Sequence, residues 1–403
     1  MADLSIEFSG LTFKNTVWLA SAEPTESFEK MKLAFDKGAG ACVAKSWRPG
    51  IEHNNLTNFA KFMVLGYDRH PVYGKNIPKF FTAHSRTGTI LGKEDAWFEE
   101  LEKTQKYAAK MDAYVIGSVF GAPIDEMVRI AKKMEQIGLK AVELDVGCPH
   151  PDEGLFAAPP EALLRDAESY YEATKKVAEN VSIPVFIKLS PQQGNLVASA
   201  GAVKHAGGAG VCCHNRFLGF MVDIDNAKPY IWGWGGTGGP WMLPIAMRWV
   251  SKIHREAPDF PILASSGPYD WEDVVRFHMA GARAVQFCST VMVKGYNVIK
   301  ESVEGLNKFL DSKGYKSVKD IIGVAVRNSY NYDEMKQLPE YRERASVNKD
   351  LCIECGKCEE LCWYGAIEHA DGYYRVIDKN CKGCRSCKIA CPIDGCISIN
   401  TLG

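Results

Sequence analysis

Two runs of cysteine near the C-terminal end have a spacing that few chemistries use. Each run has the form Cys-x2-Cys-x2-Cys-x3-Cys, and the two runs are Cys352–Cys362 and Cys381–Cys391. In two-cluster proteins with this spacing, the first three cysteines of a run hold one iron–sulfur cluster and the fourth ligates the other. The spacing therefore predicts two 4Fe–4S clusters and a function in electron transfer.

The fourth ligand of each cluster is expected to come from the other cysteine run. Structural zinc sites pair two Cys-x2-Cys knuckles rather than two runs of four. A disulfide framework is the other alternative, but Met1 to Gly10 lacks the charged and apolar regions of a secretory signal. The predicted ligand sets are Cys352, Cys355, Cys358 and Cys391 for one cluster, and Cys381, Cys384, Cys387 and Cys362 for the other.

Composition limits where the protein works and what it binds. The 403 residues, 46% of them hydrophobic, suit a large domain followed by a small one. A net charge of −1 and a pI near 6.8 provide no basic face for nucleic acid, and no apolar run reaches membrane-spanning length. Fourteen cysteines, eight of them in cluster spacing, indicate a reducing compartment. We therefore expect a cytoplasmic protein that binds neither nucleic acid nor a membrane.

Upstream of the cysteine runs, short apolar segments alternate with amphipathic helical segments such as Phe28–Lys37, Ile124–Gln136, Glu161–Glu179, Trp241–Glu256 and Trp271–Met279. Eight buried strands, each followed by a helix, predict an α/β fold, a closed (β/α)8 TIM barrel. An open doubly wound sheet is the alternative, but the chain lacks a Gly-rich phosphate turn after its first strand. The predicted strands are Thr16–Ser21, Ala41–Ser46, Tyr114–Phe120, Ala141–Gly147, Val185–Ser190, Gly210–Asn215, Ile262–Gly267 and Ala284–Ser289.

Two segments depart from the alternation. The stretch from Trp47 to Lys93 is longer than a normal connection, so we expect it to fold over the active end of the barrel. From about Asp311 the pattern becomes a charged connector. The predicted organisation is a barrel over residues 1–310, a connector over 311–345, and a small α+β ferredoxin-like domain of the bacterial two-cluster type over 346–403.

Polar residues follow most of the predicted strands. In a parallel barrel these positions gather at one end, where the chemistry takes place. Lys188 closes an apolar strand, and a buried lysine needs an anionic partner, which could be a ligand or a carboxylate such as Asp145. Two glycine- and serine-rich stretches, 235–239 and 265–268, are of a kind that cradles phosphate on backbone amides.

These residues carry a family resemblance. The strings Val-Ala-Lys-Ser at 43–46, Cys-Pro-His at 148–150 and Ile-Lys-Leu-Ser at 187–190 resemble those of the FMN-binding dihydroorotate dehydrogenase family. The whole chain resembles the FMN- and iron–sulfur-containing subunit of the dihydropyrimidine dehydrogenase family. The resemblance implies that Lys188 lies near the flavin N1/O2 edge, where a cation stabilises the anionic reduced flavin. It implies an FMN site made of Ala20, Ser21, Lys45, Ser46, Lys188, Gly239, Ser265, Ser266, Gly267, Cys288 and Ser289.

Cys148 matches the active-site cysteine of that family, on a loop above the flavin. Cysteine suits proton transfer because its pKa lies nearer neutrality than that of serine or threonine. The alternative is a buried structural thiol, as expected for Cys42. His150 either relays the proton or belongs to the scaffold.

The substrate positions differ from those of the family. Asp145 and Arg216 stand where the family has neutral residues, and a further family contact is replaced around Thr87-Gly88-Thr89. A pyrimidine presents alternating donors and acceptors that asparagine amides match and arginine cannot. Arg216 therefore either pairs with Asp145 or binds an acidic substrate. The predicted substrate-contacting set is Thr87, Thr89, Asp145, Gly147, Asn215 and Arg216.

The predicted function is an oxidoreductase acting on CH–CH groups. It would reduce or form a conjugated carbon–carbon double bond of a cyclic or acidic small molecule, with hydride passing through FMN N5 and the proton through Cys148. No Rossmann fingerprint for FAD or NAD occurs, so we expect an FAD- and NAD-binding flavoprotein subunit or a ferredoxin as electron partner, in a homo- or hetero-oligomer. The alternatives are an electron-transfer subunit whose barrel is not catalytic, and a true dihydropyrimidine dehydrogenase subunit.

Overall fold

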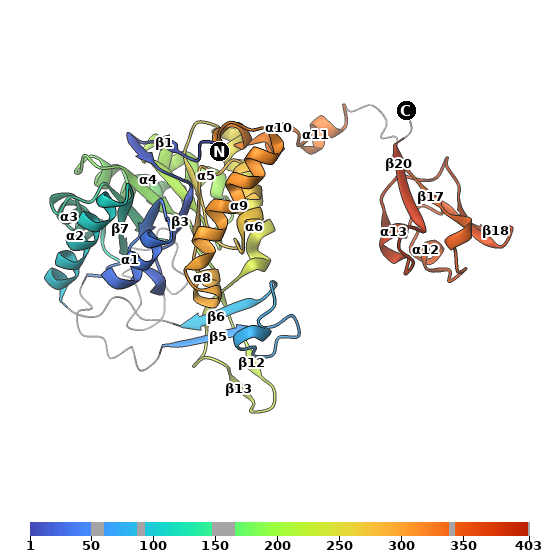
Figure 1. Ribbon diagram of the computed structural model, residues 1–403, viewed down its shortest axis with the longest axis horizontal. Coiled ribbons are helices and arrows are strands. Elements are labelled where there is room, and N and C mark those ends of the chain that lie inside the picture. The colour runs from blue at the N-terminus through green and yellow to red at the C-terminus, as the bar shows by residue number, and fades with distance from the viewer. Residues whose placement is uncertain (50–59, 87–92, 147–165, 338–342, 402–403) are drawn as a thin grey trace. The chain divides into compact units, whose positions relative to one another are not determined.

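The computed structural model describes residues 1–49, 60–86, 93–146, 166–337 and 343–401. It divides into two compact units, Met1–Asn328 and Ser329–Gly403 (Figure 1). Residues 311–328, placed in the connector by the sequence, belong to the first unit. Ser317 pairs with Asp3 there, and Val318 and Ile321 are buried. The first strand of the second unit begins at Glu343, just before the predicted domain start.

Eight parallel strands close into a barrel, which confirms the predicted TIM architecture. Every strand residue is buried except Tyr114, as expected for a packed interior covered by helices. Several predicted strands ran two or three residues too far, into the loops that form the barrel mouth. The observed strands, in sequence order, are β3 (Val17–Leu19), β4 (Ala41–Val43), β7 (Tyr114–Phe120), β8 (Ala141–Asp145), β9 (Val185–Lys188), β10 (Gly210–Cys213), β15 (Ile262–Ala264) and β16 (Ala284–Phe287).

Helices surround this barrel (Figure 1). Side-chain caps start several of them: Ser27 accepts from Lys30 N before α1, and Asp270 accepts from Glu272 N before α7. The predicted helix at 161–179 is described from residue 166 onward, and Trp241 lies in a 3-10 turn that precedes α6. The long helices are α1 (Phe28–Asp36), α2 (Glu94–Lys110), α3 (Ile124–Gln136), α4 (Ala167–Ala178), α5 (Leu196–His205), α6 (Leu243–Glu256), α7 (Trp271–Met279) and α9 (Asn297–Lys313), and the shorter ones are α8 (Ser289–Lys294), α10 (Val324–Arg327) and α11 (Tyr332–Met335).

An N-terminal hairpin plugs the end of the barrel where the strands begin. It consists of β1 (Ile6–Phe8) and β2 (Leu11–Phe13). Phe8 and Phe13 stack at 4.8 Å, and Phe13 also packs against Trp18 of β3. The aromatic plug closes this end, so a ligand must enter from the opposite one.

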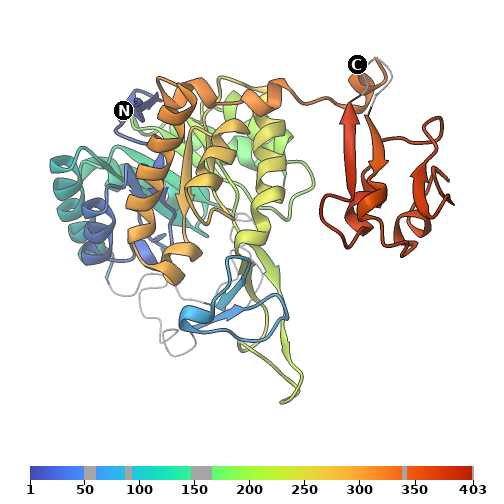
Figure 2. The same cartoon turned by 45° about the vertical axis from the view of Figure 1, so that its right-hand side comes forward.

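A four-stranded antiparallel sheet, which we call the lid sheet, lies at the opposite end (Figure 2). It joins β5 (Lys61–Leu65) and β6 (Thr82–Arg86) to β14 (Gly235–Gly238) and β11 (Phe217–Gly219). A two-stranded arm, β12 (Val222–Asp223) and β13 (Lys228–Pro229), projects from it. The described part of the 47–93 insertion therefore folds over the active end, as predicted.

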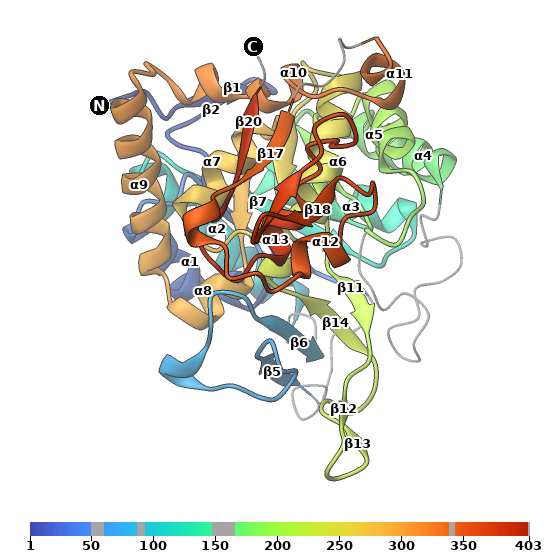
Figure 3. The same ribbon diagram turned by 90° about the vertical axis from the view of Figure 1, so that its right-hand side faces the viewer.

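The described part of the second unit contains two short antiparallel pairs of strands and short helices (Figure 3). Strand β17 (Glu343–Val347) pairs with β20 (Ile397–Thr401), and β18 (Ile367–Ala370) pairs with β19 (Tyr373–Val376). Each cysteine run forms a loop followed by one helical turn, α12 (Lys357–Glu360) or α13 (Ser386–Ala390). The cysteines are thereby gathered around a small core that includes Ala345 and Ile367.

Within the described ranges, no helix is both long and apolar enough to cross a membrane.

Candidate active site

The barrel mouth opens into a cavity of about 780 Å³ beneath the lid sheet. This volume lies within the usual range of cofactor pockets. Of the substrate positions, Asp145, Asn215 and Arg216 line it, whereas Thr87, Thr89 and Gly147 lie outside the described residues. Cys148, the candidate proton donor, also lies outside them. All eleven predicted cofactor positions line it as well: Ala20, Ser21, Lys45, Ser46, Lys188, Gly239, Ser265, Ser266, Gly267, Cys288 and Ser289.

Lys188 lies at the base of the cavity, at the end of β9. Its Nζ is 3.4 Å from Glu143 Oε1, and Gln286 Nε2 donates to the other carboxylate oxygen at 3.4 Å. Burial disfavours the charged lysine, but attraction to Glu143 and Asp145 outweighs it and raises the pKa of Lys188. The sequence suggested Asp145 as the carboxylate partner; the structure gives Glu143, one pleat earlier on the same inward-facing side of β8. Lys188 is therefore a fixed cation at the cavity floor.

A second lysine at the mouth is also paired. Lys45 Nζ lies 2.5 Å from Glu23 Oε1, in the 3-10 turn that follows β3. Burial opposes ionisation of this carboxyl, but Lys45 and Arg216 together lower the pKa of Glu23 to about 2. The sequence did not predict Glu23 as a site residue, because the predicted polar positions after the first strand ended at Ser21.

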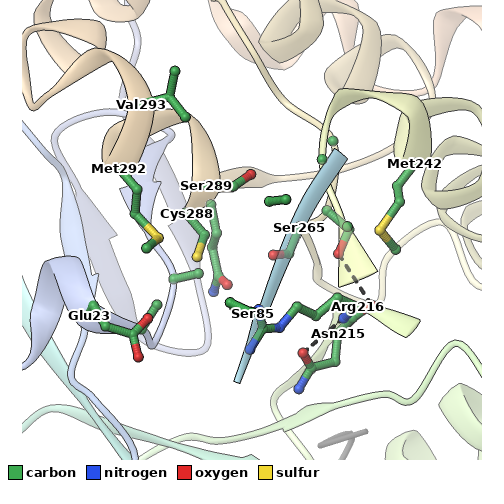
Figure 4. Close-up of a pocket in the computed structure, with 18 of the residues that line it drawn as sticks. Glu23, Ser85, Asn215, Arg216, Met242, Ser265, Cys288, Ser289, Met292 and Val293 are labelled. Atoms are coloured by element: carbon green, nitrogen blue, oxygen red, sulfur yellow. Dashed lines mark hydrogen bonds between the residues drawn. The ribbon is translucent and has the colours of Figure 1, made fainter. Parts of the chain in front are cut away.

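Arg216 reaches into the cavity from the side of Asn215 and Met242, opposite Cys288 (Figure 4). Its Nη1 donates to Ser85 Oγ of β6 at 2.5 Å. The guanidinium also packs on the backbone of Gly236, where an added Cβ would come within 2.4 Å of Arg216 Cζ. The lid sheet therefore holds this cation in place.

Arg216 makes no ion pair with any carboxylate in the part of the chain that the structure describes. Asp145, the proposed internal partner, instead accepts from Asn215 Nδ2 at 3.1 Å and from Ser46 Oγ at 3.4 Å. Glu23 is near enough for the charge of Arg216 to lower its pKa, but Glu23 is bonded to Lys45. The described structure therefore lacks the Arg216–Asp145 pair that the sequence left open.

The described lining carries an excess of positive charge. Four cations, Lys45, Lys75, Lys188 and Arg216, line the cavity with two carboxylates, Glu23 and Asp145. Glu143, beneath the cavity, pairs with Lys188, so one positive charge is left in excess. The nearby imidazoles add no charge at neutral pH, because burial lowers the pKa of both His84 and His214 to about 4. Such a cavity favours anionic ligands.

The remaining walls are apolar. Phe62, Met63 and Val64 of β5 line the cavity from the lid sheet, and Met242 and Met292 line it from the barrel. Figure 4 shows Met242 and Met292 on opposite sides. Apolar walls that carry a set of placed polar groups are typical of small-molecule and cofactor sites.

Two tight glycines shape the part of the cavity next to α6. Gly239 and Gly267 have φ values of +127° and +114°, and a Cβ would come 2.4 Å from Phe81 O or 2.5 Å from Leu243 N. Only glycine fits such positions. At the start of α6, Leu243 N already donates to Pro240 O and Pro244 has no N–H. It is the glycine backbone, which no side chain covers, that lets a phosphate group approach closely at this corner.

The second unit contains two small cavities, each lined by cysteines. One is lined by Cys352, Cys355, Cys358 and Cys391, with Cys396 beside them. The other is lined by Cys362, Cys381, Cys384 and Cys387. These groupings coincide with the predicted ligand sets, in which the fourth cysteine comes from the other run. This supports the prediction that each run supplies the fourth ligand of the other run's cluster.

The donor set fits iron–sulfur clusters better than zinc. Ala345 N and Ala366 N point at the sulfurs of Cys381 and Cys362, at 3.4 and 3.2 Å, as suits thiolate ligands. Among the described residues, no three His, Cys, Asp or Glu converge as they would around a single metal ion, and no described cysteine forms a disulfide. Each set of four sulfurs lines a small cavity.

Replacing Cys391 tests whether this cysteine ligates the cluster of the other run. Cys391→Ser is expected to damage the cluster of Cys352, Cys355 and Cys358, because it removes that cluster's fourth thiolate. Cys396 contacts Cys391 and offers a substitute thiol, so the Cys391→Ser/Cys396→Ala double variant is the sharper test. Iron content and electron paramagnetic resonance (EPR) spectra of the reduced protein would measure the loss. If only the cluster next to Cys381 is lost, the assignment of Cys391 to the other run's cluster is wrong.

Comparison with known proteins assigns both units. Residues 51–310, more than half of the chain, match the family described as dihydroorotate dehydrogenase. The chain belongs to the dihydroorotate dehydrogenase family. Residues 345–399 match the 4Fe-4S dicluster domain. The catalytic subunits of dihydroorotate dehydrogenase B (NAD(+)) from Pyrococcus furiosus and Methanocaldococcus jannaschii are 33% and 32% identical to this chain, over 80% of it and 98% of each relative.

This membership makes the chain an FMN-dependent oxidoreductase acting on CH–CH groups, with a 4Fe–4S ferredoxin domain. The cavity fits FMN: it offers a glycine-lined corner for the phosphate, a fixed cation in Lys188 and apolar walls for the ring. Sequence reasoning missed Glu23, Glu143 and Ser85. A glutamate inside an otherwise apolar strand was the available signal for Glu143; Ser85 lies in the insertion, where no pattern pointed to it.

Proposed function

We propose that this protein reduces, or in reverse forms, a carbon–carbon double bond conjugated to an acidic group. The observation that carries the proposal is Arg216, a cation held in the cavity by Ser85 and Gly236 without a carboxylate bonded to it among the described residues. A guanidinium in a half-buried pocket needs an anion, and its planar fork binds a carboxylate through two parallel hydrogen bonds. An acidic substrate supplies that anion.

The chain's own residues would bind and orient the cofactor. FMN, when bound, supplies the hydride chemistry and the link between two-electron and one-electron steps. The glycine corner at Gly239 and Gly267, together with Ser265 and Ser266, would hold its phosphate. Lys188, kept charged by Glu143, would favour the anionic reduced flavin.

Cys148 is the proposed proton donor to the substrate carbon next to the one that receives hydride. The proposal rests on the resemblance of its loop to the family's active-site loop, since Cys148 lies outside the described residues. A general acid must sit within hydrogen-bond reach of the carbon it protonates.

The pocket offers a poor match to a neutral pyrimidine. The Asn215 amide donates to Asp145, and its oxygen accepts from Arg216 N at 2.8 Å, so both ends are engaged. Arg216 carries only donors. We therefore propose a divergent member of the dihydropyrimidine dehydrogenase family with an altered substrate pocket, and expect poor turnover of uracil and thymine.

A second candidate is dihydroorotate, because relatives 33% and 32% identical are catalytic subunits of dihydroorotate dehydrogenase B (NAD(+)). Its oxidised form, orotate, is a uracil that carries a carboxylate. Its carboxylate would pair with the Arg216 guanidinium even where the ring contacts have changed, so orotate belongs among the acids to be tested.

Electrons are proposed to pass between the barrel and an external partner through the two clusters. The sequence has no dinucleotide-binding fingerprint of its own. The relatives are named as catalytic subunits, which favours a flavoprotein subunit carrying FAD and NAD as partner, with a soluble ferredoxin as the alternative. We expect a homo- or hetero-oligomer.

The proposal is tested by reducing the anaerobic protein with dithionite and adding unsaturated acids. An enzyme shows re-oxidation of the flavin spectrum with loss of the substrate double bond. A protein whose barrel only relays electrons shows neither, although its clusters are re-oxidised by an external acceptor.

Ser85 is expected to position Arg216 rather than to bind substrate itself. Ser85→Ala leaves a guanidinium N–H without its partner, so we expect KM for an unsaturated acid to rise about tenfold, equivalent to about 1.4 kcal/mol. The primary amide of the same compound provides the control, because its KM should hardly change. An equal rise for acid and amide would contradict a role through Arg216.

A further inference from the structure

The residues between the cysteines are mainly basic in one run and mainly acidic in the other. The segment Cys381–Cys391 contains the cations Lys382, Arg385 and Lys388 and no acidic residue. The segment Cys352–Cys362 contains three glutamates and one lysine. The spacing is the same in both runs, so the spacing alone does not explain this difference.

The structure places these charges against different cavities. Lys382 and Arg385 line the cavity of Cys362, Cys381, Cys384 and Cys387, which we call the basic cavity. Glu354 lines the cavity of Cys352, Cys355, Cys358 and Cys391, which we call the acidic cavity.

The partners of these side chains decide how much charge each contributes. Arg385 is paired with Glu343, at 3.0 Å, and is therefore partly compensated. Glu354 receives a hydrogen bond from His369 at 2.9 Å, but both groups are exposed to solvent. Lys382 has no ion pair with any described residue. Lys382 is thus the main uncompensated charge at the basic cavity.

Backbone dipoles act in the same direction as the side chains. At the basic cavity, Ala345 N and Ala366 N point their hydrogens at the sulfurs of Cys381 and Cys362. At the acidic cavity, the carbonyl oxygen of Ile393 lies 3.5 Å from Cys391 Sγ. A positive dipole end stabilises added negative charge on sulfur, and a carbonyl oxygen opposes it.

Reduction adds one electron to a 4Fe–4S cluster and makes the cluster with its thiolates more negative by one charge. Nearby positive charge and N–H dipoles favour that state, and nearby negative charge disfavours it. We propose that the cluster of the basic cavity has the higher reduction potential, with Lys382 and Glu354 as the side chains that separate the two potentials. This rests on the predicted ligand sets but not on the identity of the substrate.

The consequence concerns the path of electrons. A single electron delivered by an external reductant would reside on the basic cavity's cluster, and the other cluster would be reduced only at lower potential. Because the two clusters differ in reduction potential, the first electron of each two-electron turnover preferentially reduces the cluster of the basic cavity.

The experiment is an anaerobic potentiometric reduction of the holoprotein with dithionite and mediators, followed by EPR. Wild type is expected to show two reduction steps. Lys382→Gln should lower the upper step and leave the lower one in place, whereas Glu354→Gln should raise the lower step alone. Lys388→Gln is the matched control: it removes the same charge from the same run, but Lys388 does not line the cavity, so a smaller shift is expected.

Other outcomes would overturn the inference. These are a single potential for both clusters in wild type, a Lys382→Gln shift confined to the lower step, or a Lys388→Gln shift as large as that of Lys382→Gln. Should a variant lose iron, wild type compared at low and high ionic strength still decides, because screening would widen the gap if the order of the two potentials were reversed. Lys382 and Glu354 are exposed, so raising ionic strength should screen them and narrow the gap between the steps. A gap that is unchanged by salt contradicts their role.

Discussion

Arg216→Ala is expected to weaken binding of an unsaturated acid by about 2–5 kcal/mol, because it leaves the substrate carboxylate without its charged partner in a half-buried pocket. The loss should appear as a higher KM for acids, with the flavin content of the protein unchanged. Steady-state kinetics with an acid and its primary amide, compared in wild type and variant, would measure it.

Arg216→Lys provides the control for charge alone. Lysine keeps the cation but lacks the fork that binds a carboxylate through two bonds, so intermediate binding is expected. Gly236→Ala tests position: a Cβ there would displace the guanidinium, so this variant should resemble Arg216→Ala although it removes no charge. If Arg216→Ala binds acids as wild type does, the substrate anion is bound elsewhere.

Cys148→Ala is expected to slow turnover by about 10²–10⁴, the usual effect of losing a general acid. The flavin spectrum and cluster content should remain, because the proposed role concerns only the proton. Cys148→Ser should be intermediate, or equally slow if serine is too weak an acid in this site. Single-turnover re-oxidation of the reduced protein separates this step from electron supply. Unchanged turnover in both variants would make Cys148 a structural thiol.

Much of the fold could be predicted because it depends on short-range patterns. Eight apolar segments alternating with amphipathic helices define a parallel barrel, and residues after parallel strands gather at one end whatever their distance in sequence. For that reason ten of the eleven cofactor positions implied by the family resemblance line one cavity; the eleventh, Gly239, reaches the same cavity from the end of β14 in the lid sheet. The spacing of the cysteine runs likewise predicted the dicluster domain.

The pairing of charges could not be predicted in the same way. Lys188 had two carboxylates within reach on the neighbouring strand. Asp145 is its register partner on β8, but Asp145 accepts hydrogen bonds from Asn215 and Ser46, and the ammonium reaches back one pleat to Glu143. Arg216 bonds to Ser85 across more than a hundred residues, through a lid sheet whose strands come from two separate loops. Such contacts follow from tertiary packing, which a local pattern does not contain.

We propose that the cavity selects an unsaturated acid through Arg216. Orotate and uracil form a matched pair, since they share a ring and differ in the carboxylate. The decisive measurement is the rate at which each re-oxidises the anaerobically reduced protein in a stopped-flow experiment, together with a panel of other unsaturated acids and their amides. We expect faster re-oxidation by acids than by their neutral counterparts, and loss of that preference in Arg216→Ala. Rapid re-oxidation by uracil or thymine, equal to or faster than that by every acid, would contradict it.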